Sequence, residues 1–304
     1  MNRRVTLVTQ TFSGDLERFC LQRESIERCG IDLPHVAIVD HEDLPVFRDI
    51  PFNRGLTLVS TRDVLSRKIE QRRLAWGMRR REPKRWWFTR AGEPIHGWGI
   101  QQLLKLSAPS VVDTEGIVCL DCDTFFVRTI TAEDFFSIDG RLHLYETNDD
   151  IDAEMAEWPS HCMRFLGIKP TGQRLWRYTH SPVPLRRDVL LDMQVHIQKL
   201  HCRPWAEAFI DQRDWVLEYT TYGVYARHIN GLEGVAPVHP PLSVYYWWPE
   251  QAESLERDFS ERISGDQAKA VLVNSNIARP VSLYRHLAEE AWSKVGQQKQ
   301  TVTI

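Results

Sequence analysis

Short hydrophobic runs alternate with helix-like segments along the first half of the chain. Three runs rich in β-branched residues, as is typical of buried strands, lie at residues 4–9, 36–40 and 56–61. Residues 15–29 place apolar side chains on one side and end before Gly30, which predicts a helix with a glycine C-cap. Another helix is predicted over residues 98–107.

The longest strand-like run is residues 116–127, GIVCLDCDTFFV, and a further strand is predicted at 141–146. Strands that alternate with helices predict parallel neighbours, because parallel strands need crossover connections. We therefore expect an α/β fold with a mostly parallel central sheet flanked by helices.

The second half of the chain is less regular. One amphipathic helix is predicted over residues 186–201, with an apolar face made of Val189, Leu190, Met193, Ile197 and Leu200. Residues 237–249 are aromatic and proline-rich and are predicted to form a loop, and residues 296–304 a polar tail. We find no repeat or linker, so residues 1–295 are expected to form a single domain.

Composition excludes several classes of protein. The 304 residues are 42% hydrophobic and 26% charged, which is the balance of a globular chain and not of a disordered or collagenous one. A net charge of −3 argues against bulk attraction to nucleic acid. No apolar run is long enough for a membrane helix, no signal peptide is evident, and six cysteines are too sparse for a disulfide scaffold. We expect a cytoplasmic protein with reduced thiols.

A basic segment covers residues 62–90, with eleven Lys or Arg against three acidic residues. We expect a helix there, broken at Pro83. One interpretation is a solvated helix face and loop. The other is peripheral contact with an anionic surface at the inner membrane face, or with a phosphorylated ligand, aided by Trp86 and Trp87.

Polar side chains stand where the predicted strands end. They are Thr9, Gln10, Thr11, Asp40, Ser60, Thr61, Asp121, Asp123 and Glu146. In open α/β sheets ligands bind outside the carboxyl ends of the strands. The sequence therefore predicts that these side chains converge on one rim.

Asp121 and Asp123 are the strongest candidates for chemistry on this rim. Two positions apart on one strand, both carboxylates would project from the same face. Such oxygen ligands suit Mg²⁺ or Mn²⁺ held together with substrate phosphates. Cys119 and Cys122 would point to opposite faces of that strand, so they cannot share a zinc ion or form a disulfide.

Residues 97–127, a helix followed by a strand with Asp-x-Asp, resemble the corresponding unit of GT-A-fold glycosyltransferases. More narrowly, the chain is similar to a bacterial glycosyltransferase-like family of unknown function. Residues 7–19 and 36–47 match the first two strand-to-loop junctions of that family, and EYTTYGVY at 218–225 matches a block in its second half.

This resemblance implies a GT-A-like, metal-dependent transferase that uses a nucleoside-diphosphate sugar, with a UDP-type donor favoured and a glycan or lipid-linked acceptor. Residues 1–127 would form the nucleotide-sugar half and 128–295 the acceptor half. Asp121 would lie near ribose and metal, and Asp123 would bind the Mn²⁺ or Mg²⁺ that neutralises the departing diphosphate. Gln101 and Lys105 would point toward donor phosphates or sugar, although a solvated helix face is the simpler alternative.

The ends of the first two strands would bind the nucleoside. Thr9, Gln10, Thr11 and Asp40 would cradle base and ribose, whereas Thr11 could equally cap the following helix.

Glu218 is the carboxylate of the second half that we expect to act as a base or to contact the acceptor, among aromatic neighbours. The alternative is a structural pair with Arg213 or Arg227. His239 is the first candidate for a third metal ligand, before His228 and His286, although a lone histidine is more often structural.

Two other functions compete with the transferase. In a phosphatase of the haloacid-dehalogenase type, Asp121 would be the nucleophile and Asp123 the acid, with Asp149 and Asp150 as a later metal pair. That motif expects Thr or Val at position 125, where this chain has Phe. The third possibility is a non-catalytic scaffold that binds a glycan or a partner.

Overall fold

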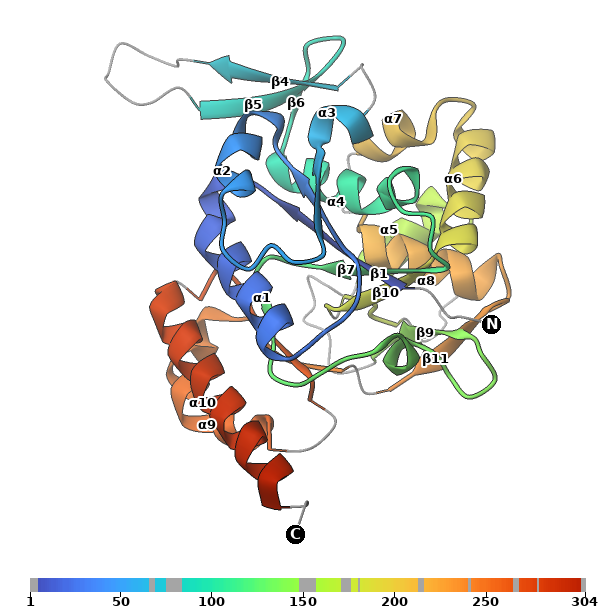
Figure 1. Ribbon diagram of the computed structural model, residues 1–304. Coiled ribbons are helices and arrows are strands. Elements are labelled where there is room, and N and C mark those ends of the chain that lie inside the picture. Colours follow the sequence, from blue (N-terminus) through green and yellow to red (C-terminus); the bar gives the residue numbers. More distant parts are fainter. Residues whose placement is uncertain are drawn as a thin grey trace.

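The computed structural model (Figure 1) describes residues 5–65, 69–74, 84–147, 157–170, 176–179, 181–212, 216–239, 242–264, 268–277 and 279–301. Asp149, Asp150 and Arg213, which the sequence brought into consideration, lie outside these residues. In the described part, no helix is long and apolar enough to cross a membrane.

A five-stranded sheet forms the centre of the protein. Its order is β10-β7-β1-β2-β3, with bounds Val183–Arg186, Gly116–Leu120, Val5–Thr11, His35–Val39 and Leu56–Ser60. Strands β7, β1, β2 and β3 are parallel, and β10 is an antiparallel edge strand. The predicted mostly parallel α/β sheet is confirmed.

Both faces of this sheet are covered by helices, which explains why its strands are continuous apolar runs. On one face Val8, Ile38 and Ile117 pack with α4, α6 and α8. On the other, Leu7 and Val118 join a cluster with α1. The helices on the first side are α4 Gly97–Leu106, α5 Trp158–Phe165, α6 Arg187–His201, α7 Trp205–Ile210 and α8 Glu218–His228, and those on the other are α1 Leu16–Arg28 and α2 Leu44–Arg48.

A second, smaller sheet lies beside α1 and is covered by the last two helices (Figure 1). Its order is β12-β13-β8, with bounds Ser243–Tyr246, Ala270–Val273 and Thr124–Phe126. The covering helices are α9 Ala252–Arg262 and α10 Val281–Thr301. A two-stranded pair is formed by β9 Leu142–Tyr145 and β11 Val235–Val238. The two predicted halves of the chain therefore share the β12-β13-β8 sheet.

In the part that the structure describes, the basic segment forms mainly strands and not the predicted helix. After the short helix α3 (Thr61–Val64), β4 (Ile69–Leu74) pairs antiparallel with β5 (Lys84–Thr89), which also pairs with β6 (Pro94–Ile95). Aromatic residues and Thr in the sequence KRWWFT favour a strand over a helix. This hairpin projects from the body (Figure 1). Residues 66–68 and 75–83, Pro83 included, lie outside the described part, and contact with a membrane stays a prediction.

Three other details differ from expectation: the bounds of one loop, the start of the tail and the exposure of one residue. The predicted loop at 237–249 contains the end of β11 and all of β12, and helix α10 continues through residue 301 into the predicted polar tail. In α6 the predicted apolar face is buried except for Leu200, which is 44% exposed at the last turn.

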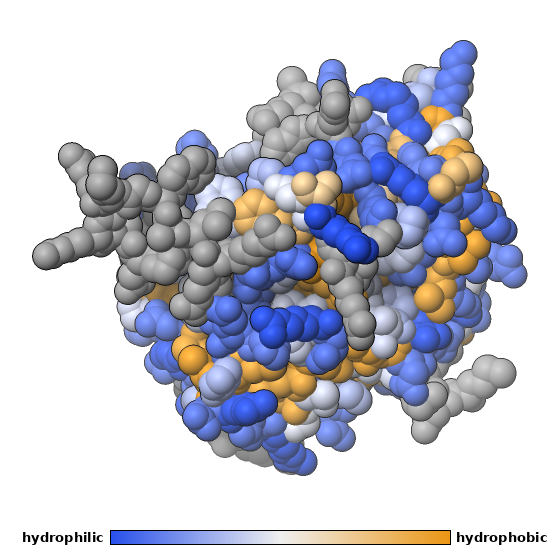
Figure 2. Space-filling view, turned by 90° about the horizontal axis from the view of Figure 1, so that it is seen from above, coloured by the Kyte–Doolittle hydropathy of each residue, from blue (hydrophilic) through white to orange (hydrophobic). Residues whose placement is uncertain are grey.

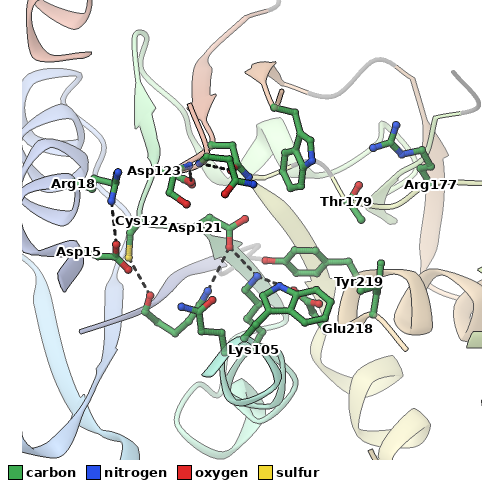
Figure 3. Close-up of a pocket in the computed structure, with 18 of the residues that line it drawn as sticks. Asp15, Arg18, Lys105, Asp121, Cys122, Asp123, Arg177, Thr179, Glu218 and Tyr219 are labelled. Atoms are coloured by element: carbon green, nitrogen blue, oxygen red, sulfur yellow. Dashed lines mark hydrogen bonds and ion pairs between the residues drawn. The ribbon is translucent and has the colours of Figure 1, made fainter. Parts of the chain in front are cut away.

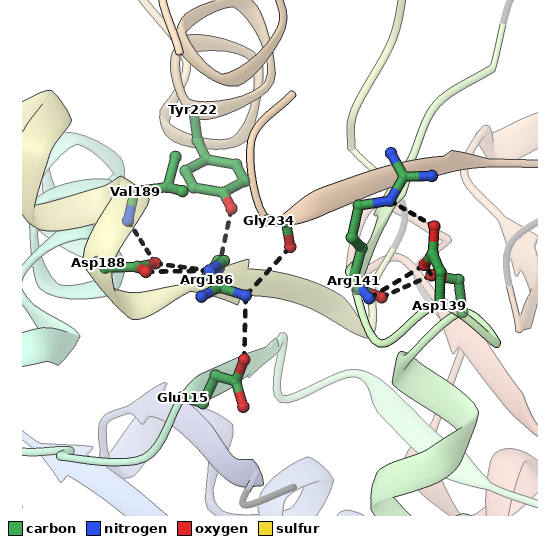
Figure 4. A network of polar contacts seen from close by, with 9 residues as sticks. Glu115, Asp139, Arg141, Arg186, Asp188, Val189, Tyr222 and Gly234 are labelled. Carbon is green, nitrogen blue, oxygen red and sulfur yellow. Dashed lines mark hydrogen bonds and ion pairs between the residues drawn. The ribbon is translucent and has the colours of Figure 1, made fainter. Parts of the chain in front are cut away.

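The second half is tied to the central sheet by a polar network around Arg186 at the end of β10 (Figure 4). The Tyr222 hydroxyl, from α8, accepts a hydrogen bond from the Arg186 backbone N–H at 2.8 Å. The Arg186 guanidinium reaches Asp188, Glu115 and the backbone oxygen of Gly234. These contacts fix α8 against the edge of the sheet.

A chain of buried hydrogen bonds runs from α1 to the end of β7. Arg23 donates to His35 Nδ1 at 2.9 Å, so His35 carries its proton on Nε2 and donates it to Thr9 Oγ1, also at 2.9 Å. Thr9 Oγ1 in turn donates to Gln22 Oε1 at 2.8 Å. The Gln22 amide N–H group donates to the backbone oxygens of Asp121 and Thr124. Thr9 therefore supports the sheet from inside.

His35 should make stability depend on pH. Burial, helped by the positive charge of Arg23, lowers the pKa of His35 well below its usual value. The unfolded chain binds a proton on this group below about pH 6.5 while the native protein does not, so stability falls as pH drops through that value, by up to about 1.4 kcal/mol per pH unit. Urea unfolding at pH 7.5 and 5.5 should show a smaller difference for His35→Gln than for the wild type. Equal pH dependence would contradict this assignment.

Gly223 in α8 should tolerate no side chain. A Cβ atom there would lie 2.3 Å from atoms of the buried Tyr178 ring. Gly223→Ala should therefore lower the free energy of unfolding by about 1–3 kcal/mol, despite the better helix propensity of Ala. Gly99→Ala in α4 is the matched control, because its nearest neighbour would be a methyl group at 3.8 Å, and it should be neutral or stabilising. Urea denaturation of both variants decides the matter.

Candidate functional site

A cavity of about 330 Å³, called the main cavity below, opens at the carboxyl ends of β1 and β7 (Figure 3). Parallel strands place their carboxyl ends on one side of a sheet, so polar residues that follow them meet there. Charged and polar residues that line the main cavity include Gln10, Asp15, Arg18, Gln101, Lys105, Asp121, Asp123, Arg177 and Glu218.

Asp121 and Asp123 lie in a turn between two sheets. Strand β7 ends at Leu120, and β8 begins at Thr124 in the other sheet, so the predicted single strand over 116–127 is wrong. The Thr124 N–H donates to the backbone oxygen of Asp121 at 3.0 Å and closes the turn. Both carboxylates still face the main cavity, but the turn directs them there, not the alternation of a strand.

Asp123 is half-buried, and one of its carboxylate oxygens, Oδ1, is a buried atom. Its Oδ2 accepts from the Ser275 N–H at 3.2 Å, whereas its Oδ1 has no hydrogen-bond partner among the described residues. Burial first, and then the nearby charge of Asp121, raises the pKa of Asp123 to about 7. A positive charge at Oδ1 would offset both effects.

Lys105 in α4 joins the two halves of the site. Its Nζ lies 2.8 Å from Asp121 Oδ1 and 2.7 Å from Glu218 Oε1. The Lys105 and Glu218 side chains are 8% and 7% exposed and that of Asp121 is 27% exposed, so the Lys105–Glu218 pair is buried and Asp121 lies at its more open side. Lys105 was expected to face donor phosphates, but here both carboxylates hold its ammonium group.

Local contacts fix this charge cluster. Burial disfavours the Lys105 ammonium, but Asp121 and Glu218 outweigh it and raise the pKa of Lys105 well above its usual value. The Glu218 N–H, at the start of α8, donates to Gln102 Oε1 at 3.0 Å. The Gln10 amide N–H group also approaches Asp121 Oδ1, at 3.4 Å.

A second hollow of about 520 Å³, the adjoining cavity, shares Gln10, Gln101 and Trp98 with the main cavity. Other residues that line it are Thr11, Phe12, Asp40, Gln71, Trp86 and Trp87. Asp40 Oδ2 accepts from Gln71 Nε2 at 2.8 Å. The structure thus brings Gln10, Thr11, Asp40 and Gln101 to two connected hollows, with Thr9 buried behind them.

His239 does not line the main cavity. Its Nε2 lies 3.5 Å from Glu146 Oε1, and its ring stacks on Trp176 at 5.2 Å between centroids. Glu146 itself pairs with Arg227, so Arg227 is not the partner of Glu218. His286 lies on α10, 3.4 Å from Glu290. In the described ranges, no group of three His, Cys, Asp or Glu residues is placed to bind a metal.

Several residues of the site were missed in the sequence. Asp15 and Arg18, at the start of α1, pair at 3.3 Å and line the main cavity. Asn274, Ser275 and Asn276 line it from the end of β13. The apolar run AVLV at 270–273, followed by Asn-Ser-Asn, is the signal that could have found them by the strand-end rule. Gln22 carried no such signal.

Hydrophilic residues cover most of the molecular face seen in Figure 2, and hydrophobic areas take up smaller parts of it. Two of the exposed large hydrophobic residues are Phe12 and Trp98, which are 38% and 39% exposed. Both line the adjoining cavity, and Trp98 also lines the main cavity. The exposed side chains of Phe12 and Trp98 therefore form part of the walls of the site.

Solved structures similar to this chain are glycosyltransferases. One is the galactosyltransferase LgtC in complex with donor and acceptor sugar analogs, with a TM-score of 0.47 and 14% identity over 94% of this chain and 95% of that one. Another is the glycosyltransferase GlyE of Streptococcus pneumoniae TIGR4, with a TM-score of 0.49 and 11% identity over 99% of this chain and 64% of that one. A third is mouse xyloside xylosyltransferase 1, with a TM-score of 0.46 and 11% identity over 91% of this chain and 100% of that one.

No curated protein matches the sequence. The family described as "Family of unknown function (DUF6492)" matches residues 5–260, which contain β1, the Asp121–Asp123 turn, Lys105 and Glu218. Because this match spans most of the chain, the protein belongs to the DUF6492 family of unknown function.

Proposed function

We propose that the protein is a metal-dependent glycosyltransferase that moves a sugar from a nucleoside-diphosphate sugar to a glycan or lipid-linked acceptor. The observation that carries this proposal is the Oδ1 oxygen of Asp123, a buried atom of a half-buried carboxylate that lines the main cavity beside Asp121 and has no hydrogen-bond partner in the described structure. A carboxylate in that state costs free energy unless a positive charge approaches it.

Asp121 and Asp123 would hold Mn²⁺ or Mg²⁺. The free Oδ1 of Asp123 and the raised pKa of its carboxyl group fit such a cation. When bound, the cation supplies positive charge that stabilises the departing diphosphate. His239 is left out of this ligand set, because it lies against Glu146 and Trp176.

The main cavity would bind the diphosphate of the donor, and the adjoining cavity its base and ribose. Arg18 and Arg177 line the main cavity and are the side chains that would attract the diphosphate. Thr11, Asp40, Trp86 and Trp87 line the adjoining cavity, where aromatic rings and polar groups suit a base and ribose. Gln101 lines both and would contact the donor where they meet.

Glu218 would accept the proton of the attacking acceptor hydroxyl. Its contact with the Lys105 ammonium holds it at the main cavity, which it lines (Figure 3). Lys105 is thus a positioning residue, which sets the distance between Asp121 on the donor side and Glu218 on the acceptor side.

Binding of nucleoside diphosphates tests the proposal. We expect calorimetry with UDP, GDP, CDP and ADP to show binding of one of them, strengthened by Mn²⁺. Asp123→Asn removes a charged ligand and should weaken this binding at least about thirty-fold, the equivalent of about 2 kcal/mol. Asp139→Asn is the control, because Asp139 pairs with Arg141 at an exposed turn and should leave binding unchanged.

Three results would overturn the proposal. One is equal Mn²⁺-dependent affinity in Asp123→Asn and the wild type. Another is no binding of any diphosphate, together with Mg²⁺-dependent release of phosphate from p-nitrophenyl phosphate, which would favour the dehalogenase-type phosphatase. The third is silence in both assays, which would favour a scaffold.

The role of Lys105 can be measured by a double-mutant cycle in the metal-free protein. Lys105→Met leaves two carboxylates without their shared counter-charge and should lower the free energy of unfolding by about 3–5 kcal/mol. Glu218→Gln leaves the contact between Lys105 and Asp121 intact, so it should lower the free energy of unfolding by less, about 1–2 kcal/mol. In the double variant, the loss of unfolding free energy should be smaller than the sum of the two single losses by at least about 0.5 kcal/mol, as expected for contacting residues. Strictly additive losses in urea unfolding would refute the coupling.

A further inference from the structure

Tyr219, the second residue of α8, presents a buried hydroxyl group without a partner. The residue is 4% exposed, and its ring lines the main cavity beside Asp121 (Figure 3). Within the described residues, its hydroxyl oxygen makes no hydrogen bond. An unsatisfied buried hydroxyl costs about 1–3 kcal/mol, so such a group at a cavity is matched to something that enters it.

The ring of Tyr219 is held in place without help from its hydroxyl. Lys105 Nζ lies 4.4 Å from the ring centroid, in cation–π contact. Lys105 is itself fixed by Asp121 and Glu218. Burial, and then the charge of Asp121, raises the pKa of Tyr219 well above its usual value, so the phenol keeps its proton and can donate it.

A second unpartnered group, an acceptor and not a donor, lines the same cavity. Gln10, 5% exposed, gives its N–H group to Asp121, which leaves its Oε1 as a buried acceptor with no partner in the described structure. Oε1 can only accept, whereas the Tyr219 phenol can donate. Together they match a ligand whose groups both accept and donate hydrogen bonds.

The surrounding charge selects the ligand. The Lys105 ammonium beside Tyr219 is already paired with Asp121 and Glu218, so it is not the group that would attract a phosphate. The diphosphate would instead meet Arg18 and Arg177, which line the same cavity. A sugar hydroxyl accepts from the phenol and donates to a carboxylate or to Gln10 Oε1, and it brings no charge.

We propose that Tyr219 is a substrate-recognition residue whose hydroxyl donates a hydrogen bond to a hydroxyl group of a sugar bound in the main cavity. This assignment rests on the proposed transferase function. It adds that Tyr219 recognises a hydroxyl group of the sugar. The sugar hydroxyl belongs either to the donor sugar or to the acceptor, and the two arms of the experiment separate these sources.

The first arm compares wild type and Tyr219→Phe by calorimetry in Mn²⁺. The probes are UDP and GDP, and UDP-glucose, UDP-galactose, UDP-N-acetylglucosamine and GDP-mannose. Tyr219→Phe should bind the free diphosphate as the wild type does, but bind the preferred nucleotide sugar about three- to tenfold more weakly, as the loss of one neutral hydrogen bond predicts. The second arm titrates methyl glucoside, methyl galactoside and methyl mannoside into protein saturated with diphosphate and Mn²⁺. A loss confined to this arm assigns the hydroxyl to the acceptor.

Two tyrosines provide matched controls. Tyr145 is buried with an unpartnered hydroxyl in the described structure but does not line the main cavity, so Tyr145→Phe should leave all affinities unchanged. Tyr222, one turn after Tyr219, accepts from the Arg186 N–H, so Tyr222→Phe should lower thermal stability and leave sugar affinity intact. Tyr219→Phe should be as stable as the wild type or more so, because it loses no protein contact.

The outcomes are separable. If the diphosphate binds but Tyr219→Phe matches the wild type in both arms, Tyr219 does not read the sugar and this assignment is wrong while the proposed function stands. If Tyr219→Phe instead loses stability as Tyr222→Phe does, its hydroxyl has a structural role and the assignment is likewise wrong. If the wild type binds no diphosphate, the proposed function fails first, and the assignment with it.

Discussion

The site depends on the ion pairs that the buried ammonium group of Lys105 makes with two carboxylates. This ammonium group contacts Asp121, from the turn after β7, and Glu218, from the start of α8, at 2.8 and 2.7 Å. Without it, the two carboxylates would repel each other, and Glu218 would be buried without a counter-charge. With the lysine between them, both carboxylates have a cationic partner and line one cavity. The same ammonium packs on the Tyr219 ring, so one cation organises Asp121, Glu218 and this aromatic ring.

The turn that carries Asp121 and Asp123 is held from behind by hydrogen bonds that all run in one direction. Arg23 donates to His35, His35 to Thr9, Thr9 to Gln22, and Gln22 to the backbone of the turn. Every group in this series is buried. Such a network holds the turn and its carboxylates in place, because fully satisfied buried polar networks rigidify a structure. Thr9 thus serves the site from inside the sheet.

Much of the fold could be predicted because burial leaves a local signature. Strands β1, β2 and β7 are buried along their whole length, so each reads as a largely apolar or β-branched run, and the rim lies at their ends, at Gln10, Asp40 and Asp121. The same signature misled at residues 116–127, because Phe125 and Phe126 are buried as deeply in the second sheet as Ile117 is in the first. Hydrophobicity continues across the turn while the chain changes sheet. In residues 62–90, the many charged residues favoured the prediction of a solvated helix, whereas the consecutive aromatic residues Trp86, Trp87 and Phe88 are typical of a strand.

The sequence by itself determined the α/β class, the parallel order of alternating strands and helices, and the carboxylates at the strand ends, since each depends on the spacing of apolar residues or on the end of a strand. Only the tertiary structure decided that Lys105 contacts Glu218, that Thr9 is structural, that His239 lies with Glu146, and that Asn274, Ser275 and Asn276 reach the cavity. These facts join residues far apart in the chain. Their pairing depends on how helices pack on the sheet, and packing is a property of the whole fold that no local pattern encodes.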